Sequence, residues 1–412
     1  MNPRRVVVTG MGVVSPVGND CGTFFESLLA ARSGIRGLSA SFAGRLTANV
    51  GGEVDYDPAT RFSKAKLGLL DRFSQFALEA SAQAIQDSGL EFEESLKGST
   101  AVFVGTGLGG ACTIENGYEE IFLQNKDRVS PYIVPRAMNN AAAGHISIDY
   151  GLRGPSVTYS TACSSSAIAI GEACRTIRHG YADAAIAGGA ESLLTLGTIR
   201  AWEALRTLAV TDTDDPAASC RPFSKDRTGL VLAEGAGMVV LENLEHALRR
   251  GARIHAELIG YGAGSDAAHL TRPGLEGQIE AMRQALADAG IAPEEVDYIN
   301  AHGTATLAGD VIETAAIKRV FGAATRIPVS STKSMHGHLM GATAAVEFIA
   351  SVLAIKHRAV PPTANLRVAD PECDLDYVPN RGRKEIGVRT VMSNSFAFGG
   401  SNAVLIARAF GG

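Results

Sequence analysis

Hydrophobic residues recur along the chain at two different spacings. One spacing is typical of helices, and the other is typical of buried strands. Residues 73–89 repeat apolar positions at helical spacing and end at a glycine, and STAVFVGT (residues 99–106) then has the pattern of a strand. The same order returns at residues 277–290, a helix that ends in DAG as the earlier one ends in DSG, followed by a strand at residues 296–301. The pattern predicts an α/β protein in which one helix–strand unit occurs twice.

A second strand and helix follow each of these units. Residues 156–162 (SVTYSTA) alternate like a buried strand and lead into small and apolar residues at helical spacing from Ser164 onward. In the second half, IPVSSTKS (residues 327–334) predicts a strand, and a helix follows over residues 341–357. We therefore expect two α/β halves, residues 1–255 and 256–412, with strands buried between helices and the two strand-to-helix turns face to face.

The N-terminal segment RVVVTGMGVVSPVG (residues 5–18) predicts an apolar strand followed by a glycine turn, an arrangement shared with dinucleotide sites. The dinucleotide fingerprint needs a third glycine or alanine two residues later and then a helix, whereas Ser15 and Pro16 interrupt the segment here. In addition, no acidic residue ends a second strand about 20 residues further on. We interpret the glycines as turn formers.

The composition excludes several classes of function. The chain has 412 residues, of which 46% are hydrophobic and 20% charged, as in a globular enzyme with a large core. A formal net charge of -5 argues against a nucleic-acid-binding protein. No apolar run approaches the roughly 20 residues of a membrane span, and we expect a cytoplasmic protein without a signal peptide or membrane contact. The 6 cysteines form no CxxC pair, so neither a disulfide framework nor a zinc cluster is indicated.

Cys163 lies at the expected turn between strand and helix. The unpaired N–H groups and the dipole at a helix start stabilise an anion, so we expect the pKa of this thiol to fall and its nucleophilicity to rise. Its neighbours Ala162, Ser164 and Ser165 are small enough to leave the sulfur open to a substrate. A buried structural thiol is the alternative interpretation, because most free cysteines are of that kind.

Two histidine segments are expected to face this cysteine across the duplicated fold. His302 leaves a strand end in NAHGTATLAGD, and TKSMHGH carries Lys333, His336 and His338. Histidines at matched strand ends opposite a cysteine predict a catalytic site. A zinc site formed by Cys163, His302 and His338 is an alternative, although it lacks the short ligand pair that zinc sites usually contain.

Four segments of the chain carry a family resemblance. TACSSS at Cys163, HGTATLAGD at His302, TKSMHGH ending at His338, and SNSFAFGGSNA at residues 393–403 resemble the signature segments of the elongating β-ketoacyl-acyl carrier protein synthases, in order and at that family's spacing. The similarity extends from RVVVTGMG to NAVLIARAF. It implies a thiolase fold in a layered αβαβα architecture, a homodimer or a heterodimer with a related subunit, and decarboxylative condensation of an acyl thioester with malonyl-acyl carrier protein in fatty acid elongation. It implies no metal, and no cofactor other than the phosphopantetheine on the acyl carrier protein.

The resemblance also implies roles for the central residues. Cys163 is expected to be the nucleophile that takes the acyl chain. His302 and His338 are expected to polarise the malonyl thioester and to stabilise the enolate left by loss of CO2. Lys333 is expected to orient the histidines and to pair with Glu347.

Further residues are expected around the substrate. The N–H groups of Cys163 and Phe398 are expected to form the oxyanion hole, and Phe398 to gate the acyl pocket. The remaining expected contacts are Thr304, Thr306 and Thr271 for the pantetheine, Leu108, Trp202, Leu230 and Phe396 for the acyl pocket, and Lys64, Lys66, Arg72 and Arg206 for docking of the acidic carrier. For Thr304 and Thr306 the alternative is capping of the loop after His302, and for the four cations it is an ordinary solvated charge.

Three positions depart from the family pattern, and we expect all three near the pocket or the gate. His336 replaces a threonine or small residue, Ala397 replaces a glycine beside the gate, and Leu230 replaces an aromatic residue in RTGLVLAEG. Together with the single tryptophan, Trp202, these departures suggest a specialised lipid or polyketide pathway, such as one that makes polyunsaturated chains.

Three other protein classes remain as alternatives. A non-catalytic chain-length partner keeps the fold but lacks the nucleophile, whereas Cys163 is present here. A biosynthetic thiolase uses a second cysteine near the C-terminus, where this chain has FAFGG. A cysteine hydrolase needs one histidine and an orienting residue, for which Asn300 is a candidate, and it releases free acid without malonyl thioester.

Overall fold

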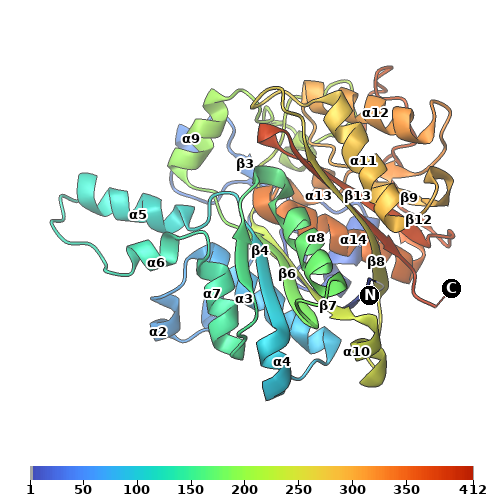
Figure 1. The fold of residues 1–412 in the computed structure, drawn as a ribbon. Coiled ribbons are helices and arrows are strands. Elements are labelled where there is room, and N and C mark those ends of the chain that lie inside the picture. The colour runs from blue at the N-terminus through green and yellow to red at the C-terminus, as the bar shows by residue number, and fades with distance from the viewer. Residues whose placement is uncertain (1–2, 412) are drawn as a thin grey trace.

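Two halves with the same strand order lie side by side in one ten-stranded sheet, in the computed structural model that describes residues 3–411 (Figure 1). The strands of the first half are β1 (Val6–Val14), β4 (Thr100–Gly105), β5 (Ser156–Tyr159), β6 (Ala184–Glu191) and β7 (Gly235–Asn243). Those of the second half are β8 (Ala256–Ser265), β9 (Tyr298–Asn300), β10 (Val329–Ser330), β13 (Thr390–Phe396) and β14 (Ser401–Arg408). From the centre outward the order is β1-β7-β6-β4-β5 on one side and β8-β14-β13-β9-β10 on the other, which confirms the duplication.

Helices cover both faces of this sheet. The longer ones are α1 (Cys21–Leu29), α3 (Arg72–Ser88), α5 (Ala111–Phe122), α7 (Ala141–Tyr150), α8 (Ser165–Arg178), α9 (Leu196–Ala204), α11 (Leu275–Ala289), α12 (Leu307–Phe321) and α14 (Thr343–His357). The shorter elements are α2 (Lys64–Leu67), α4 (Glu94–Ser99), α6 (Ile133–Ala137), α10 (Leu244–Arg249), α13 (Lys333–His336), β2 (Arg36–Gly37), β3 (Val50–Gly51), β11 (Ala359–Val360) and β12 (Arg383–Lys384).

The helices and strands stack in five layers. Among the described residues, the two halves of the sheet join only where β1 pairs with β8. Helices α8 and α14 lie between the halves, in contact with strands of both. Helices α3 and α7 cover the outer face of the first half, and α11 and α12 cover that of the second. The largest apolar core therefore surrounds α8 and α14 (Figure 1), as the αβαβα expectation requires.

Helix α14 belongs to this core. The segment Met340–His357 is long and apolar enough to cross a membrane, with a mean hydropathy of 1.2, but 89% of it is buried inside the protein. Its contacts with β7 and β13 account for that apolarity, because a helix between the two halves of the sheet is buried on all sides. Helix α14 is thus a central core helix.

Most of the predicted elements are present, with shifted ends. Helices α3 and α11 end at glycines in the left-handed conformation, Gly89 (φ 59°) and Gly290 (φ 64°), as the DSG and DAG endings predict. The strand predicted over residues 327–334 is only two residues long, since the chain turns into α13 at Lys333.

Two predictions about local structure were wrong. Strand β5 is not a buried strand: it lies at the edge of the sheet, and Ser156 and Val157 are exposed. Gly10 and Gly12 do not form a turn, because β1 runs through both. A Cβ on either would lie 2.0 Å from a backbone oxygen of α3, so glycine at these positions lets α3 pack directly on the strand.

Candidate active site

Cys163 is presented by a short, constrained turn. A 3-10 turn at Ala162–Ser164 separates β5 from α8, and Ala162 has a φ of 51°, which is unfavourable for a residue with a Cβ. The Ser165 hydroxyl closes the turn, since it accepts a hydrogen bond from Thr161 N–H (2.9 Å) and donates to the Ala162 carbonyl (2.6 Å). This turn fixes the Cys163 side chain at the start of α8, where it is 5% exposed.

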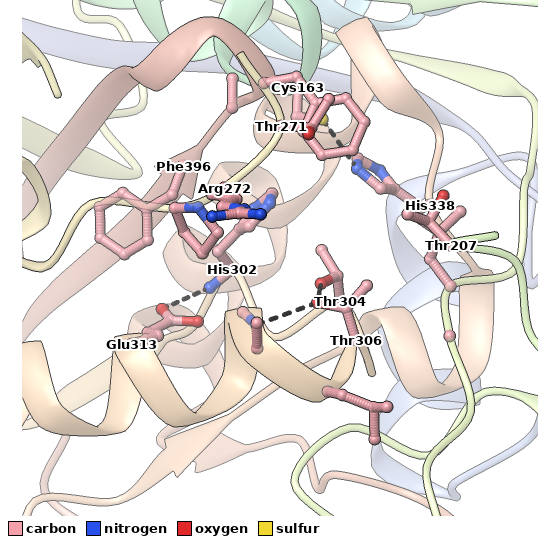
Figure 2. Close-up of a pocket in the computed structure, with 18 of the residues that line it drawn as sticks. Cys163, Thr207, Thr271, Arg272, His302, Thr304, Thr306, Glu313, His338 and Phe396 are labelled. Carbon is pink, nitrogen blue, oxygen red and sulfur yellow. Dashed lines mark hydrogen bonds between the residues drawn. The ribbon is translucent and has the colours of Figure 1, made fainter. Parts of the chain in front are cut away.

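The sulfur opens into a pocket of about 260 Å³ whose walls come from both halves of the chain (Figure 2). Cys163 comes from the first half, and His302, His338 and Phe396 come from strand ends or loops of the second. The Nε2 atom of His338 lies 3.1 Å from Cys163 Sγ, and the rings of His302 and His338 are 5.6 Å apart. The duplicated fold therefore brings together the cysteine and both histidines of the predicted site.

Hydrogen bonds fix the tautomer of His338. Its Nδ1 accepts a hydrogen bond from Met340 N–H (3.2 Å), so the proton of the neutral ring is on Nε2. The Thr343 hydroxyl lies 2.8 Å from the same Nδ1 and can only donate to it. His338 therefore presents an Nε2–H group to Cys163 and to the pocket.

Lys333 fixes the second histidine. Its Nζ lies 3.4 Å from His302 Nδ1, 2.5 Å from the His302 carbonyl oxygen and 2.7 Å from Glu347 Oε1. Because an ammonium group only donates, His302 Nδ1 is an acceptor and the ring carries its proton on Nε2. Lys333 and Glu347 are both fully buried, so the ion pair expected from the resemblance is present and lies directly behind His302.

Glu313 supports the site as well, and it was not predicted from the sequence. Its carboxylate accepts hydrogen bonds from the N–H groups of His302 (2.8 Å) and Gly303 (2.7 Å), and it also lines the pocket (Figure 2). A glutamate on α12 that is bonded to a loop ten residues earlier has no signature in the sequence. It sets the backbone of His302, and Thr343 likewise orients His338.

Burial keeps both histidines neutral. It lowers the pKa of His302 and of His338 well below the usual value, and the nearby Lys333 ammonium lowers both further. Burial also raises the pKa of Glu347 to about 7, against the opposing effect of Lys333. Two neutral imidazoles with fixed Nε2–H groups are suited to donate hydrogen bonds to an oxygen that gains negative charge.

The expected fall in the pKa of Cys163 is wrong. Burial raises the pKa of this thiol to about 11, although Lys333 and the N–H groups of Phe398 and Cys163 itself oppose the rise. The apolar surroundings of the sulfur, which include Leu230 and Met340, outweigh the helix start. The assignment of the N–H groups of Cys163 and Phe398 to the oxyanion hole stays a prediction.

Cys163, His302 and His338 also match the zinc alternative in one respect. Their potential ligand atoms lie within 4.8 Å of one another, and all three side chains are buried. Within residues 3–411, however, this cluster has three members, whereas a structural zinc site has four protein ligands. The Nε2–H group of His338 also faces the sulfur at 3.1 Å, in agreement with the hydrogen-bonding role described above.

His336 does not lie at the pocket, contrary to the prediction. Its ring is fully buried, with Nδ1 2.7 Å from the Gly337 carbonyl oxygen and Nε2 2.9 Å from the Thr332 hydroxyl. Burial lowers its pKa to about 3. His336 is therefore a neutral residue whose hydrogen bonds shape the loop that carries His338.

Most of the other predicted contact residues line the pocket. They are Trp202, Leu230, Thr271, Thr304, Thr306, Phe396 and Phe398. The Thr304 and Thr306 hydroxyls are 3.0 Å apart, and Thr306 also caps α12 by accepting Gly309 N–H at 3.2 Å, so the capping alternative holds for Thr306. Leu108 is the exception, since its side chain is 51% exposed and does not contribute to this pocket.

The four predicted docking cations differ in their surroundings. Arg72 forms a bidentate ion pair with the buried Glu234 (2.6 and 2.9 Å), which contradicts its assignment as a docking residue. Lys66 pairs with Asp149 at 2.5 Å, and Lys64 is exposed. Arg206 is exposed at the pocket, together with Arg272, which the sequence analysis missed.

Asn300 does not orient a histidine, as the hydrolase alternative would require. The amide of Asn300 donates weak hydrogen bonds, at 3.5 Å each, to the Thr332 hydroxyl and the Glu347 carbonyl oxygen. Neither partner is a histidine, so Asn300 does not complete a catalytic triad.

Comparisons with known proteins agree with this geometry. Residues 3–247 match the model of the β-ketoacyl synthase N-terminal domain, and residues 255–367 match that of the C-terminal domain. The 3-oxoacyl-[acyl-carrier-protein] synthase 2 of Coxiella burnetii is 47% identical over 410 residues, covering 98% of this chain and 99% of the relative.

Two solved structures are similar over nearly the whole chain. The ishigamide ketosynthase/chain length factor has a TM-score of 0.92 and 38% identity, covering 99% of this chain and 100% of that one. A type II PKS acyl-carrier protein in complex with its ketosynthase has a TM-score of 0.89 and 34% identity, covering 99% of both chains. The chain belongs to the β-ketoacyl synthase family.

Proposed function

We propose that the protein is a 3-oxoacyl-[acyl-carrier-protein] synthase that condenses an acyl thioester with malonyl-acyl carrier protein in fatty acid elongation. One observation carries the proposal: Cys163 Sγ, the Nε2 atom of His338 at 3.1 Å, and His302 converge in one pocket. The similarity to 3-oxoacyl-[acyl-carrier-protein] synthase 2 over 98% of the chain supports the same reaction.

The first half-reaction is acyl transfer to Cys163. The sulfur attacks the thioester carbonyl carbon, a new C–S bond forms, and the bond to the pantetheine sulfur breaks. The proton of the thiol leaves with the departing pantetheine thiol. Because burial raises the thiol pKa to about 11, deprotonation accompanies the attack, and the N–H groups of Cys163 and Phe398 stabilise the tetrahedral oxyanion.

The second half-reaction is decarboxylation and condensation. Loss of CO2 from the malonyl thioester leaves an enolate, whose oxygen receives hydrogen bonds from the Nε2–H groups of His302 and His338. The enolate carbon then attacks the acyl-Cys163 carbonyl, and the C–S bond to Cys163 breaks. The negative charge that the malonyl carboxylate left behind is now on the cysteine sulfur, which takes up one proton and becomes the thiol again.

The test separates the two half-reactions. An acyl carrier donor alone should add one acyl mass to the wild-type protein and none to Cys163→Ala. His302→Ala should retain acylation but lose condensation by about a hundredfold or more, because it removes one enolate donor. His179→Ala, at an exposed histidine outside the pocket, is the matched control, and its condensation rate should stay near wild type. Equal loss of both half-reactions in His302→Ala would refute the assignment of His302.

A specialised lipid or polyketide pathway is the second candidate. The pocket contains Trp202 and Leu230, and the ishigamide ketosynthase is similar over 99% of the chain. Product masses from acyl carriers of graded length and unsaturation distinguish the candidates. A preference for unsaturated acyl chains over saturated chains of equal length would favour the specialised pathway.

We also propose an acyl carrier protein and a second ketosynthase-type subunit as partners. Both kinds of assembly occur among the similar structures, as a carrier complex and as a ketosynthase/chain length factor pair. Helices α5 and α6 project from the body of the protein (Figure 1), and Tyr118, Phe122, Leu123 and Val134 are exposed on this projection. Strand β5 lies at the open edge of the sheet. The edge and the exposed side chains of α5 and α6 together are suited to bind a second subunit.

A further inference from the structure

The single tryptophan of the chain, Trp202, stacks on the side chain of Phe398. The ring centroids are 5.5 Å apart and the planes are inclined by 21°. Both residues line the pocket that contains Cys163. The stacked pair is therefore placed where an acyl chain on Cys163 must lie or pass.

The backbone that carries Trp202 is held at both ends. Helix α9 begins beside Glu115, whose carboxylate accepts the first two helical N–H groups at 2.8 Å each. Near the other end of α9, Glu203 accepts two N–H groups of residues 47–48 at 2.6 and 2.8 Å. Helix α9 is thus tied to α5 on one side and to the segment before β3 on the other, and Trp202 is the fixed ring of the pair.

The backbone that carries Phe398 is more adaptable. Gly399 and Gly400 have φ values of 81° and 72°, and a Cβ on Gly399 would meet no atom within 4 Å. Gly399 is exposed, and its N–H donates to the Leu270 carbonyl at 2.7 Å. When the stack opens, Phe398 is therefore the ring that moves.

We propose that Trp202 is a specificity-determining residue that holds Phe398 closed and favours acyl chains long enough to replace Phe398 against the indole face. This inference rests on the proposed function, because it requires an acyl group on Cys163. Apolar residues of the same cluster as Cys163, namely Leu193, Ile199, Leu230 and Met340, provide the surroundings that such a chain needs. A two-carbon acyl group is too short to restore the contact that Phe398 gives up.

The emission of Trp202 reports directly on the stack, since no other tryptophan contributes. Acylation by acetyl-pantetheine should change the emission spectrum most, because Phe398 leaves the indole face and the acetyl group does not replace it. Acylation by octanoyl-pantetheine should change the spectrum less, because the longer chain covers the indole again. Mass spectrometry on the same samples verifies that Cys163 is acylated in both. The Phe398→Leu protein should already show altered emission when free, with little further change on acetylation. An unchanged wild-type spectrum at full acetylation would overturn the proposal, whereas absence of acylation would instead contradict the proposed function.

Substitution at Trp202 tests selectivity separately. An aromatic stack of this kind biases an equilibrium by about two- to tenfold, so Trp202→Leu should reduce the octanoyl-to-acetyl ratio of acylation kcat/KM by about that factor. Trp202→Phe keeps an aromatic face and should retain most of the ratio, which controls for loss of side-chain size. If both variants retain the wild-type ratio while remaining acylated, Trp202 does not set specificity. If Trp202→Leu does not fold, the octanoyl-to-acetyl ratio of acylation kcat/KM is measured on Phe398→Leu instead. That variant also lacks the stack, so its ratio should fall in the same way.

Discussion

The thiol of Cys163 is buried among apolar side chains, and this burial opposes its ionisation. Because the pKa is raised to about 11, the thiolate fraction should increase about tenfold for each pH unit between pH 7 and pH 10. The rate of alkylation by iodoacetamide, followed by the mass of the Cys163 peptide, should rise with the same slope. The Cys163→Ser variant is the control, because its alkylation measures the reaction of the other cysteines. A rate that levels off below pH 9 would show that the helix start controls this pKa after all.

The central residues of the site could be predicted from the sequence, but their environment could not. Cys163, His302, His338 and Lys333 lie in motifs whose local order shows which side chains leave strand ends. The pKa of Cys163 depends instead on side chains that reach it from distant segments, such as Met340. The position of His336 depends on its hydrogen bonds inside the loop, and an alternating pattern of histidines does not reveal which ring faces the pocket.

At the scale of elements, helix α8 packs closely on β8 because Gly171 has no side chain. An added Cβ would lie 2.4 Å from the Tyr261 ring, which is buried and also has the Arg175 guanidinium 4.4 Å from its centroid. Gly171→Ala should therefore lower the free energy of unfolding by about 1–3 kcal/mol, although alanine is the better helix former. Chemical denaturation measures the change.

Gly98 in α4 is the matched control, because a Cβ there would meet no atom within 4 Å. Gly98→Ala should leave stability unchanged or raise it by up to about 1 kcal/mol, as expected from helix propensity alone. If the two alanine variants have equal stability, close packing of α8 on Tyr261 does not constrain the fold.

The elements that local patterns predicted well are those with a local cause. The ends of α3 and α11 follow from Gly89 and Gly290, whose left-handed conformation terminates a helix wherever it occurs. The role of Gly10 and the edge position of β5 have a distant cause, namely the approach of α3 in one case and the missing neighbour strand in the other. Alternating residues indicate a strand but not its place in the sheet.

At the scale of the whole molecule, the projecting face of α5 and α6 should hold the subunits together. Phe122 and Leu123 are 71% and 74% exposed, which is costly for side chains of this size unless a partner covers them. The double variant Phe122→Asp, Leu123→Asp should shift the protein from dimer to monomer in light scattering. Leu248→Asp, an exposed leucine on α10, is the control and should remain dimeric. A wild-type protein that is monomeric when free would contradict a homodimer through this face.

Docking of the carrier requires local attraction, because the chain and its proposed partner are both acidic. With a net charge of -5, the protein needs a local basic region at the pocket to avoid repulsion on encounter. Arg72 and Lys66 have acidic partners, whereas Arg206 and Arg272 are exposed at the pocket itself. We therefore expect these two arginines, more than Lys66 or Arg72, to attract the carrier.

Arg206→Glu should raise the KM for acyl carrier substrate about three- to tenfold at low salt, since it replaces an attraction by a repulsion. The effect should shrink as salt shortens the range of the interaction, and turnover of a small pantetheine thioester should stay nearly unchanged. Lys384→Glu makes the same change in net charge on the exposed strand β12 and should leave both KM values near wild type. An equal loss with the small thioester would show that Arg206 supports the pocket, and a matching effect of Lys384→Glu would show that net charge, not a docking position, governs the encounter.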